Sequence, residues 1–211
     1  MTELRMTDAG ERENLAAFVA RVVRLDGAAL VRLRERGNGM VEAWATTPFD
    51  VLATRSVLGG VTPPDVTVSG NELLAALAVA GGDRMDPGPQ RDVMWRSELP
   101  TTSAWQLIDE LPSRVIADVT ERGLAAARDS AGPQGTPPAS LLDQAVLTVS
   151  NDNLDVRIQL RALFALSGMG FTGPGEVDDV VRVSATGSWM RVDARYGAVL
   201  RRRHALLPLL F

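Results

Sequence analysis

The sequence of 211 residues contains no cysteine, no lysine and only one histidine, His204. Without cysteine there are no disulfides, no thiolate nucleophiles, and no zinc or iron–sulfur sites that use thiolate ligands. Without lysine, the phosphate-binding lysine of a P-loop and the amine of a Schiff-base enzyme are both excluded. A single histidine excludes two-histidine zinc motifs, and His204 lies in no motif typical of a catalytic base. We therefore expect no metal, no cofactor and no catalytic residue that a short motif would reveal.

Long apolar runs are absent as well, and the first 14 residues are polar and charged. A membrane span needs about 18 or more apolar residues, and a signal peptide needs an apolar segment after its basic start. These absences predict a cytoplasmic protein without membrane contact. The 45% of hydrophobic residues suffices for a folded core, and the net charge of −4 gives no whole-molecule attraction to nucleic acid. All 22 basic residues are arginine, which indicates the codon bias of a GC-rich bacterial genome.

The fold class predicted for this chain is α+β, with a small N-terminal antiparallel sheet and a C-terminal helical unit. A Pro- and Gly-rich segment at residues 131–138 is the best candidate for a linker. It divides the chain into an α+β unit at residues 1–130, which contains a three-stranded meander, and a helix-helix-β-hairpin unit at residues 139–211. In the first unit, hydrophobic periodicity and turn residues predict helices at 15–25, 71–80, 101–110 and 113–129, and strands at 29–36, 40–47, 51–58 and 92–99.

The register of the first hairpin can be predicted from charge and polarity. A two-residue turn at Asn38 and Gly39 would place Glu35 opposite Glu42, and like charges across a sheet are destabilising. A three-residue loop at 37–39 instead places Arg34 opposite Glu42, and it gathers the apolar side chains on the other face. Gly39 then supplies the left-handed residue that such a loop requires. The sequence therefore predicts the three-residue loop.

The C-terminal unit has predicted helices at 140–149 and 154–167, followed by strands at 178–185, 188–194 and 196–202. This order resembles a winged helix, in which the last helix enters the major groove and the hairpin contacts the DNA backbone. Residues 180–211 also carry six arginines against one acid, which is typical of a nucleic-acid or anion site. The second helix argues against this interpretation, because its apolar residues leave almost no polar face to read bases. The candidate arginines are Arg182, Arg191, Arg195, Arg201, Arg202 and Arg203.

The chain ends in an apolar segment, residues 205–211, that supplies the candidate interface residues. An apolar terminus left in water is unusual, so we expect it to dock on its own unit or on a neighbouring subunit. The candidate interface residues are Leu206, Leu207, Leu209, Leu210 and Phe211.

The function favoured by the sequence is a non-catalytic protein that binds a protein partner or associates with itself. Two alternatives stay open. One is a DNA-binding regulator that uses the C-terminal unit. The other is an enzyme that assembles carboxylates from distant elements, with or without Mg²⁺, because oxygen ligands are the ones this ion prefers.

Overall fold

The computed structural model describes residues 2–100, 104–130, 137–151, 154–173 and 179–203. The chain forms two compact units, which we call unit 1 (residues 1–98 with 168–170) and unit 2 (residues 99–167 with 171–211). The changeover between them thus lies at Glu98 and Leu99. The linker expected at 131–138 falls mostly outside the described residues and stays a prediction.

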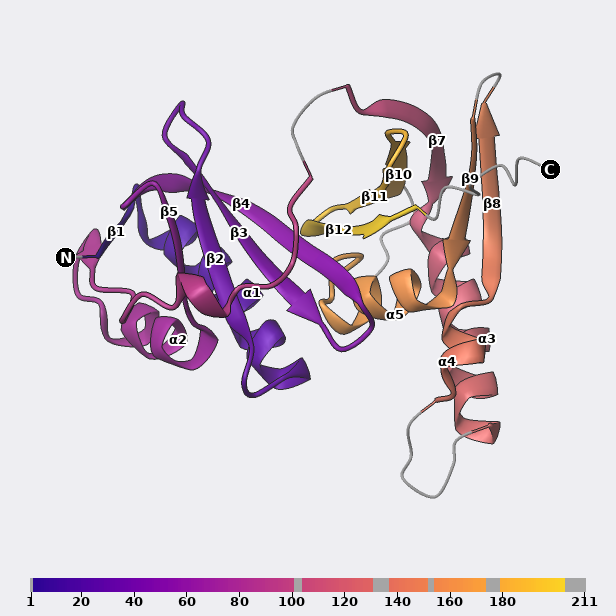
Figure 1. Cartoon of the computed structure of the whole chain (residues 1–211), viewed down its shortest axis with the longest axis horizontal. Coiled ribbons are helices and arrows are strands. Elements are labelled where there is room, and N and C mark those ends of the chain that lie inside the picture. Colours follow the sequence, from indigo (N-terminus) through magenta and orange to yellow (C-terminus); the bar gives the residue numbers. More distant parts are fainter. Residues whose placement is uncertain (1, 101–103, 131–136, 152–153, 174–178, 204–211) are drawn as a thin grey trace. The chain divides into compact units, whose positions relative to one another are not determined.

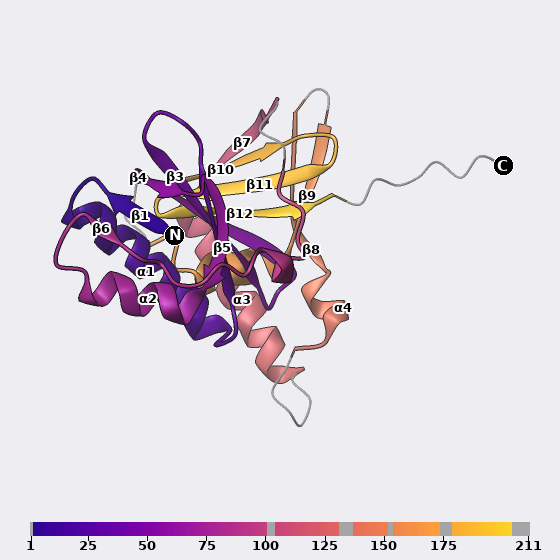
Figure 2. The ribbon, with the colours of Figure 1, turned by 60° about the vertical axis from the view of Figure 1, so that its left-hand side comes forward.

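In unit 1, antiparallel strands pair in the order β5-β2-β3-β4, and the end of β4 also pairs with β1, which pairs with β6. Two helices lie side by side (Figure 2), and α1 contacts β3 and β4 while α2 contacts β5. The elements are β1 (Glu3–Met6), α1 (Ala9–Leu25), β2 (Leu30–Glu35), β3 (Met40–Thr47), β4 (Val51–Thr62), β5 (Asp65–Ser69), α2 (Gly70–Val79), β6 (Arg84–Met85) and the 3-10 helix η1 (Asp92–Met94).

The spacing of apolar residues along each helix and strand determines which side chains form the core of unit 1. Apolar residues of α1 recur every three or four positions and form one buried stripe, while those of the strands alternate with polar residues. Asp8 starts α1, because its carboxylate accepts a hydrogen bond from the Glu11 backbone N–H at 2.9 Å. That bond lowers the pKa of Asp8 below its ordinary value. The fully buried core side chains include Leu15, Phe18, Val19, Val31, Leu33, Val41, Ala43, Ala45, Val66, Val68 and Leu73.

The predicted register of the first hairpin is confirmed. Arg34 pairs with Glu42 and Arg32 pairs with Trp44 across β2 and β3. The three residues of the loop all have positive φ, with Gly39 at 69°. The apolar face expected for this register is buried, as Val31, Leu33 and Val41 are 0% exposed.

In unit 2, antiparallel strands pair in the order β7-β10-β11-β12, and β8 and β9 form a two-stranded sheet. Figure 1 shows β8 and β9 as a long hairpin. The elements are β7 (Gln106–Pro112), α3 (Ser113–Asp129), α4 (Ala139–Leu142), β8 (Ala145–Asn151), β9 (Leu154–Gln159), α5 (Leu160–Gly168), β10 (Val180–Ala185), β11 (Trp189–Ala194) and β12 (Gly197–Arg202).

The predicted α+β class and its winged-helix-like order are wrong. The architecture is mostly antiparallel sheet with few helices. The predicted helix at 140–149 is largely strand β8, and the first part of the helix expected at 154–167 is strand β9. Residues 154–159 alternate apolar and polar side chains, and Val156 and Ile158 are buried, which is the period of a strand. The described residues therefore contain no helix-turn-helix in this part of the chain.

Two elements of the first half also differ from prediction. The segment expected to be a helix at 101–110 contains strand β7 from Gln106, and the strand expected at 92–99 begins as the 3-10 helix η1. Strands β1 and β5 were not predicted. No helix among the described residues is long and apolar enough to cross a membrane.

Candidate interaction surfaces

The polar face of the unit 1 sheet is held by arginine–carboxylate pairs. Arg32 makes two hydrogen bonds to the Asp65 carboxylate, at 2.7 and 2.8 Å, and Arg34 approaches the same group at 3.2 Å. The bond to Asp65 raises the pKa of Arg32 above its ordinary value. The register of β2 and β5 places Arg34 opposite Asp65, and Arg32, two residues earlier on the same face, reaches Asp65 diagonally.

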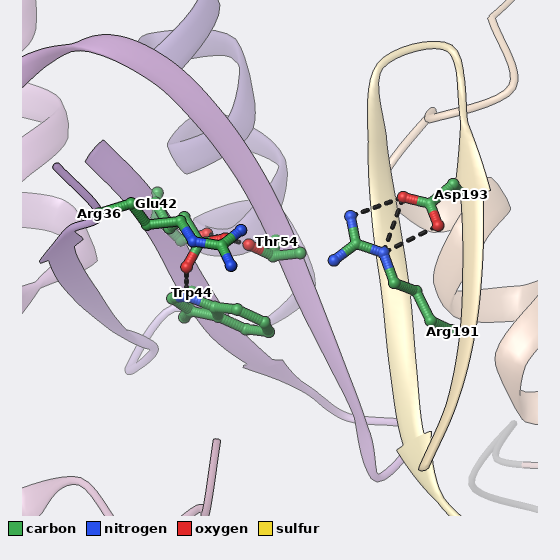
Figure 3. Close-up of polar contacts among 7 residues, drawn as sticks. Arg36, Glu42, Trp44, Thr54, Arg191 and Asp193 are labelled. Atoms are coloured by element: carbon green, nitrogen blue, oxygen red, sulfur yellow. Dashed lines mark hydrogen bonds and ion pairs between the residues drawn. The ribbon is translucent and has the colours of Figure 1, made fainter. Parts of the chain in front are cut away.

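A buried carboxylate lies on the next strand of the same face. Glu42 on β3 is only 5% exposed. Arg36 donates to one of its oxygens at 2.8 Å, and the Trp44 indole N–H donates to the other at 3.3 Å (Figure 3). Both oxygens of the Glu42 carboxylate therefore accept hydrogen bonds inside the protein, which gives Glu42 a structural role in the sheet.

The segment at residues 91–95 is fixed against β5 and α2. The Arg91 backbone N–H donates to the Thr67 carbonyl at 2.7 Å, and the Thr67 N–H donates to the Asp92 carboxylate at 2.6 Å. The Arg91 guanidinium pairs with Glu72 at 2.8 Å. Trp95 at the end of the segment makes a cation–π contact, because the centre of its ring lies 5.9 Å from the Arg32 guanidinium carbon.

Two large apolar side chains project from this fixed segment. Val93 is 85% exposed and Met94 is 52% exposed. We call these two residues the tip. Large apolar side chains scattered on a surface are ordinary, but a rigidly anchored pair carries little ordering cost on binding. The tip is therefore the feature of unit 1 best suited to protein contact.

The candidate arginines of the C-terminal third all lie in unit 2, on or beside β10, β11 and β12. Arg182 pairs with Glu110 at 2.6 Å, and this bond raises its pKa above the ordinary value. Arg191 binds both oxygens of Asp193 (Figure 3), and Arg195 pairs with Asp179 at 3.3 Å. Each of these three positive charges is thus neutralised by a carboxylate of its own unit.

The three consecutive arginines are also engaged. Arg201 donates to Gln159 and lies 3.8 Å from Asp143, and Arg202 lies 5.2 Å from the Trp189 ring centre. Arg203 donates through its guanidinium to the backbone carbonyls of Thr186 and Asp155, at 3.0 and 2.8 Å. The structure does not gather these arginines into one open basic cluster, since neighbouring strand residues point to opposite faces.

Helices α1 and α3 also do not provide a strongly basic surface for a phosphate backbone. Helix α1 carries three arginines and two glutamates, and α3 carries three arginines and three acidic residues. A phosphate backbone is bound through several cations, and α1 has only one positive charge in excess while α3 has none. Among the described residues, no group of three acidic residues or histidines is placed to hold a metal ion. His204 and the candidate interface residues at 206–211 lie outside the described residues.

Sequence reasoning missed the tip and the buried Glu42. The tip is not predicted by the sequence, because residues 92–99 are predicted to form a strand, whereas Asp92–Met94 form the 3-10 helix η1. The pairing of Glu42 with an arginine was expected, but with Arg34, its cross-strand neighbour. The observed partner, Arg36, lies beyond the end of β2 and reaches Glu42 with its long side chain.

Comparison with protein families gives two matches that meet between residues 97 and 100. A model described as "Domain of unknown function (DUF8010)" matches residues 1–97, and one described as "Domain of unknown function (DUF8185)" matches residues 100–206. This division coincides with the changeover between the compact units. No curated protein matches the sequence.

Solved structures similar to this chain include bacterial sliding clamps. A putative DNA polymerase III beta subunit from Eubacterium rectale superposes with a TM-score of 0.61 at 10% identity, over 96% of this chain and 64% of that one. The DNA polymerase sliding clamp from Bacillus subtilis gives 0.57 at 10% identity, over 99% and 66%. The DNA polymerase III beta subunit from Thermotoga maritima gives 0.55 at 9% identity, over 99% and 66%.

These similarities establish the fold. The chain resembles the sliding-clamp fold over nearly its whole length, and it spans about two thirds of the clamps it matches. At such low identity the likeness carries no residue from one protein to another, because unrelated functions share folds.

Proposed function

Because the chain belongs to the family described as "Domain of unknown function (DUF8185)", whose model covers more than half of it, and has the sliding-clamp fold, we propose that it is a non-catalytic interaction protein. In this proposal the protein binds other proteins through surface residues of its two units, which have the sliding-clamp fold. The proposal places this role in the bacterial cytoplasm, since the similar structures named above come from bacteria.

The tip is the observation that carries the proposal. Hydrogen bonds from Thr67 and Arg91, and the stacking of Trp95 on Arg32, fix the turn that presents Val93 and Met94. An apolar pair held in this way resembles the small anchors that dominate protein interfaces. The charged groups described above favour the same role, because they stabilise the protein's own strands instead of facing an open site.

A photo-crosslinking experiment tests this role. A photoreactive amino acid at Val93 is expected to capture one defined protein in the cell of origin, to be identified by mass spectrometry. The same amino acid at Val79, which is 82% exposed in the same unit, serves as the control and is expected to capture none. The purified partner should then bind the V93S/M94S variant about tenfold or more weakly than the unaltered chain, because burying an anchor supplies at least that much affinity.

Two results would contradict the proposal. One is equal capture from positions 93 and 79, or none from either. The other is steady turnover of a substrate that stops when a single carboxylate is replaced, which would favour the carboxylate-based enzyme.

DNA association is the second candidate function. The observation that favours it is the likeness to clamps of DNA polymerase, and the paired arginines and balanced helices oppose it. It no longer involves a winged helix, since that arrangement is not present. We expect a short DNA duplex to show no saturable binding in a fluorescence-anisotropy titration at about 50 mM salt. Binding that weakens steeply between about 50 and 200 mM salt would instead establish contact with several phosphates.

A further inference from the structure

Met94, one of the two residues of the tip, is the most exposed methionine among the described residues, at 52%. The chain has no cysteine, so methionine provides its only sulfur atoms. The other described methionines are partly or fully buried, and they are Met6, Met40, Met85, Met169 and Met190. An oxidant dissolved in water reaches an exposed thioether before a buried one. Oxidation of the folded protein is therefore directed to the tip.

The backbone around Met94 keeps its side chain at the surface. The Met94 N–H donates to the Arg91 carbonyl at 2.9 Å, and the Trp95 N–H donates to the Asp92 carbonyl at 3.1 Å. These bonds close the turn of η1, and the bond from the Thr67 N–H to the Asp92 carboxylate holds it against β5. Turning Met94 inward would break bonds of this set. A sulfoxide at Met94 therefore stays in water and leaves the core of unit 1 intact.

We propose that Met94 is an oxidation site and that its sulfoxide weakens the binding of a protein partner to the tip. The proposal rests on the interaction role of the tip and adds its regulation. Hydrogen peroxide is the oxidant, and the thioether sulfur is oxidised by two electrons. A sulfur–oxygen bond forms as the O–O bond breaks, and the second peroxide oxygen leaves as water. Methionine sulfoxide reductases, which oxidise thiols in exchange and release the oxygen as water, restore the thioether.

The sulfoxide makes one of the two apolar side chains of the tip polar. Its oxygen is a strong hydrogen-bond acceptor, and water satisfies it while the tip is exposed. A partner that covers the tip would bury this oxygen, and burying a polar group without a hydrogen-bond partner is unfavourable. Since the tip consists only of Val93 and Met94, the change removes half of its apolar contact. A bound partner in turn shields Met94 from the oxidant, because the two effects are linked.

Peroxide oxidation of the full chain tests the site itself. In dilute hydrogen peroxide, peptide mass spectrometry over time is expected to show Met94 oxidised about tenfold or more faster than Met6 and Met169. These two residues are the internal controls, because both belong to unit 1 and are 1% exposed. The oxidised chain should also elute earlier from a hydrophobic-interaction column, since its surface is more polar, whereas M94L should show no such shift.

The variants M94Q and M94L test the effect on binding. Glutamine is similar in length to methionine and carries a polar oxygen as the sulfoxide does, whereas leucine stays apolar and resists oxidation. With the photoreactive amino acid at Val93, M94Q is expected to capture the protein partner about tenfold or more weakly than the unaltered chain. Peroxide treatment of the unaltered chain should weaken capture to the same degree. M94L is the matched control and should capture the partner equally well before and after peroxide.

Three results would overturn the proposal. The first is oxidation of Met94 no faster than that of Met6 and Met169. The second is capture by M94Q equal to that of the unaltered chain. The third is peroxide lowering capture by M94L as much as capture by the unaltered chain, which would place the sensitive group elsewhere. Absence of capture from the unaltered chain would contradict the interaction role, and its regulation with it. The oxidation rates are measured without a partner, so the two failures can be distinguished.

Discussion

Replacing Gly59 with alanine is expected to lower the free energy of unfolding by about 3 kcal/mol. Gly59 lies on β4 opposite Met6 on β1. A Cβ atom at this position would lie 2.3 Å from the Arg5 carbonyl oxygen and 2.6 Å from the end of the buried Met6 side chain. Backbone oxygen cannot rotate away as a side chain can, so β1 must shift from β4. Urea unfolding monitored by circular dichroism measures the loss.

The adjacent Gly60 is the matched control for Gly59. An added Cβ there meets only the mobile end of the Arg5 side chain, at 3.6 Å, so G60A should change stability by less than about 0.5 kcal/mol. Both variants restrict the unfolded chain by the same amount, so the difference between their unfolding midpoints reports the clash alone. Equal midpoints for G59A and G60A would show that β1 does not pack against β4 as described.

How far the sequence predicts this fold can be judged from two hairpins. The register of β2 and β3 could be derived, because one pairing put like charges opposite each other and the other did not. The hairpin of β8 and β9 was missed. Its second strand runs without a break into α5, and the apolar residues of 154–166 fit a helical stripe when they are taken together. Only the strict alternation over 154–159 separates the strand from the helix.

The candidate surfaces were less predictable than the elements. The abundance of arginine near the C-terminus was visible, but whether each charge is open or paired depends on partners far along the chain. Arg182, for example, pairs with Glu110, 72 positions away, because β10 lies beside β7. Strand order decides such partners, and strand order is set by long-range packing that local patterns do not encode. The tip also depends on long-range packing, because the hydrogen bonds that fix its segment come from Thr67 on β5 and Glu72 on α2.

Replacing Arg36 with methionine is expected to cost about 2 kcal/mol of stability, although Arg36 itself is 40% exposed. The cost arises at its partner, because the buried Glu42 side chain would be left with only the Trp44 N–H as a hydrogen-bond partner. If so, adding E42Q to R36M should recover most of the loss, since glutamine removes the charge and still accepts the Trp44 hydrogen bond. Urea unfolding of the two single variants and the double variant at neutral pH gives the coupling.

Arg34 provides the control for this argument, because it matches Arg36 in residue type and in exposure, at 41%. Its partner Asp65 is 37% exposed, whereas the Glu42 side chain is 7% exposed. Ion pairs at the surface contribute about 0–1 kcal/mol, and Asp65 keeps its two hydrogen bonds from Arg32, so R34M should cost clearly less than R36M. Similar losses for R34M and R36M, or no recovery on adding E42Q, would contradict the view that burial of the Glu42 carboxylate sets the cost. The comparison thus sets the loss of the one arginine partner of a buried carboxylate against the loss of one of two arginine partners of an exposed carboxylate.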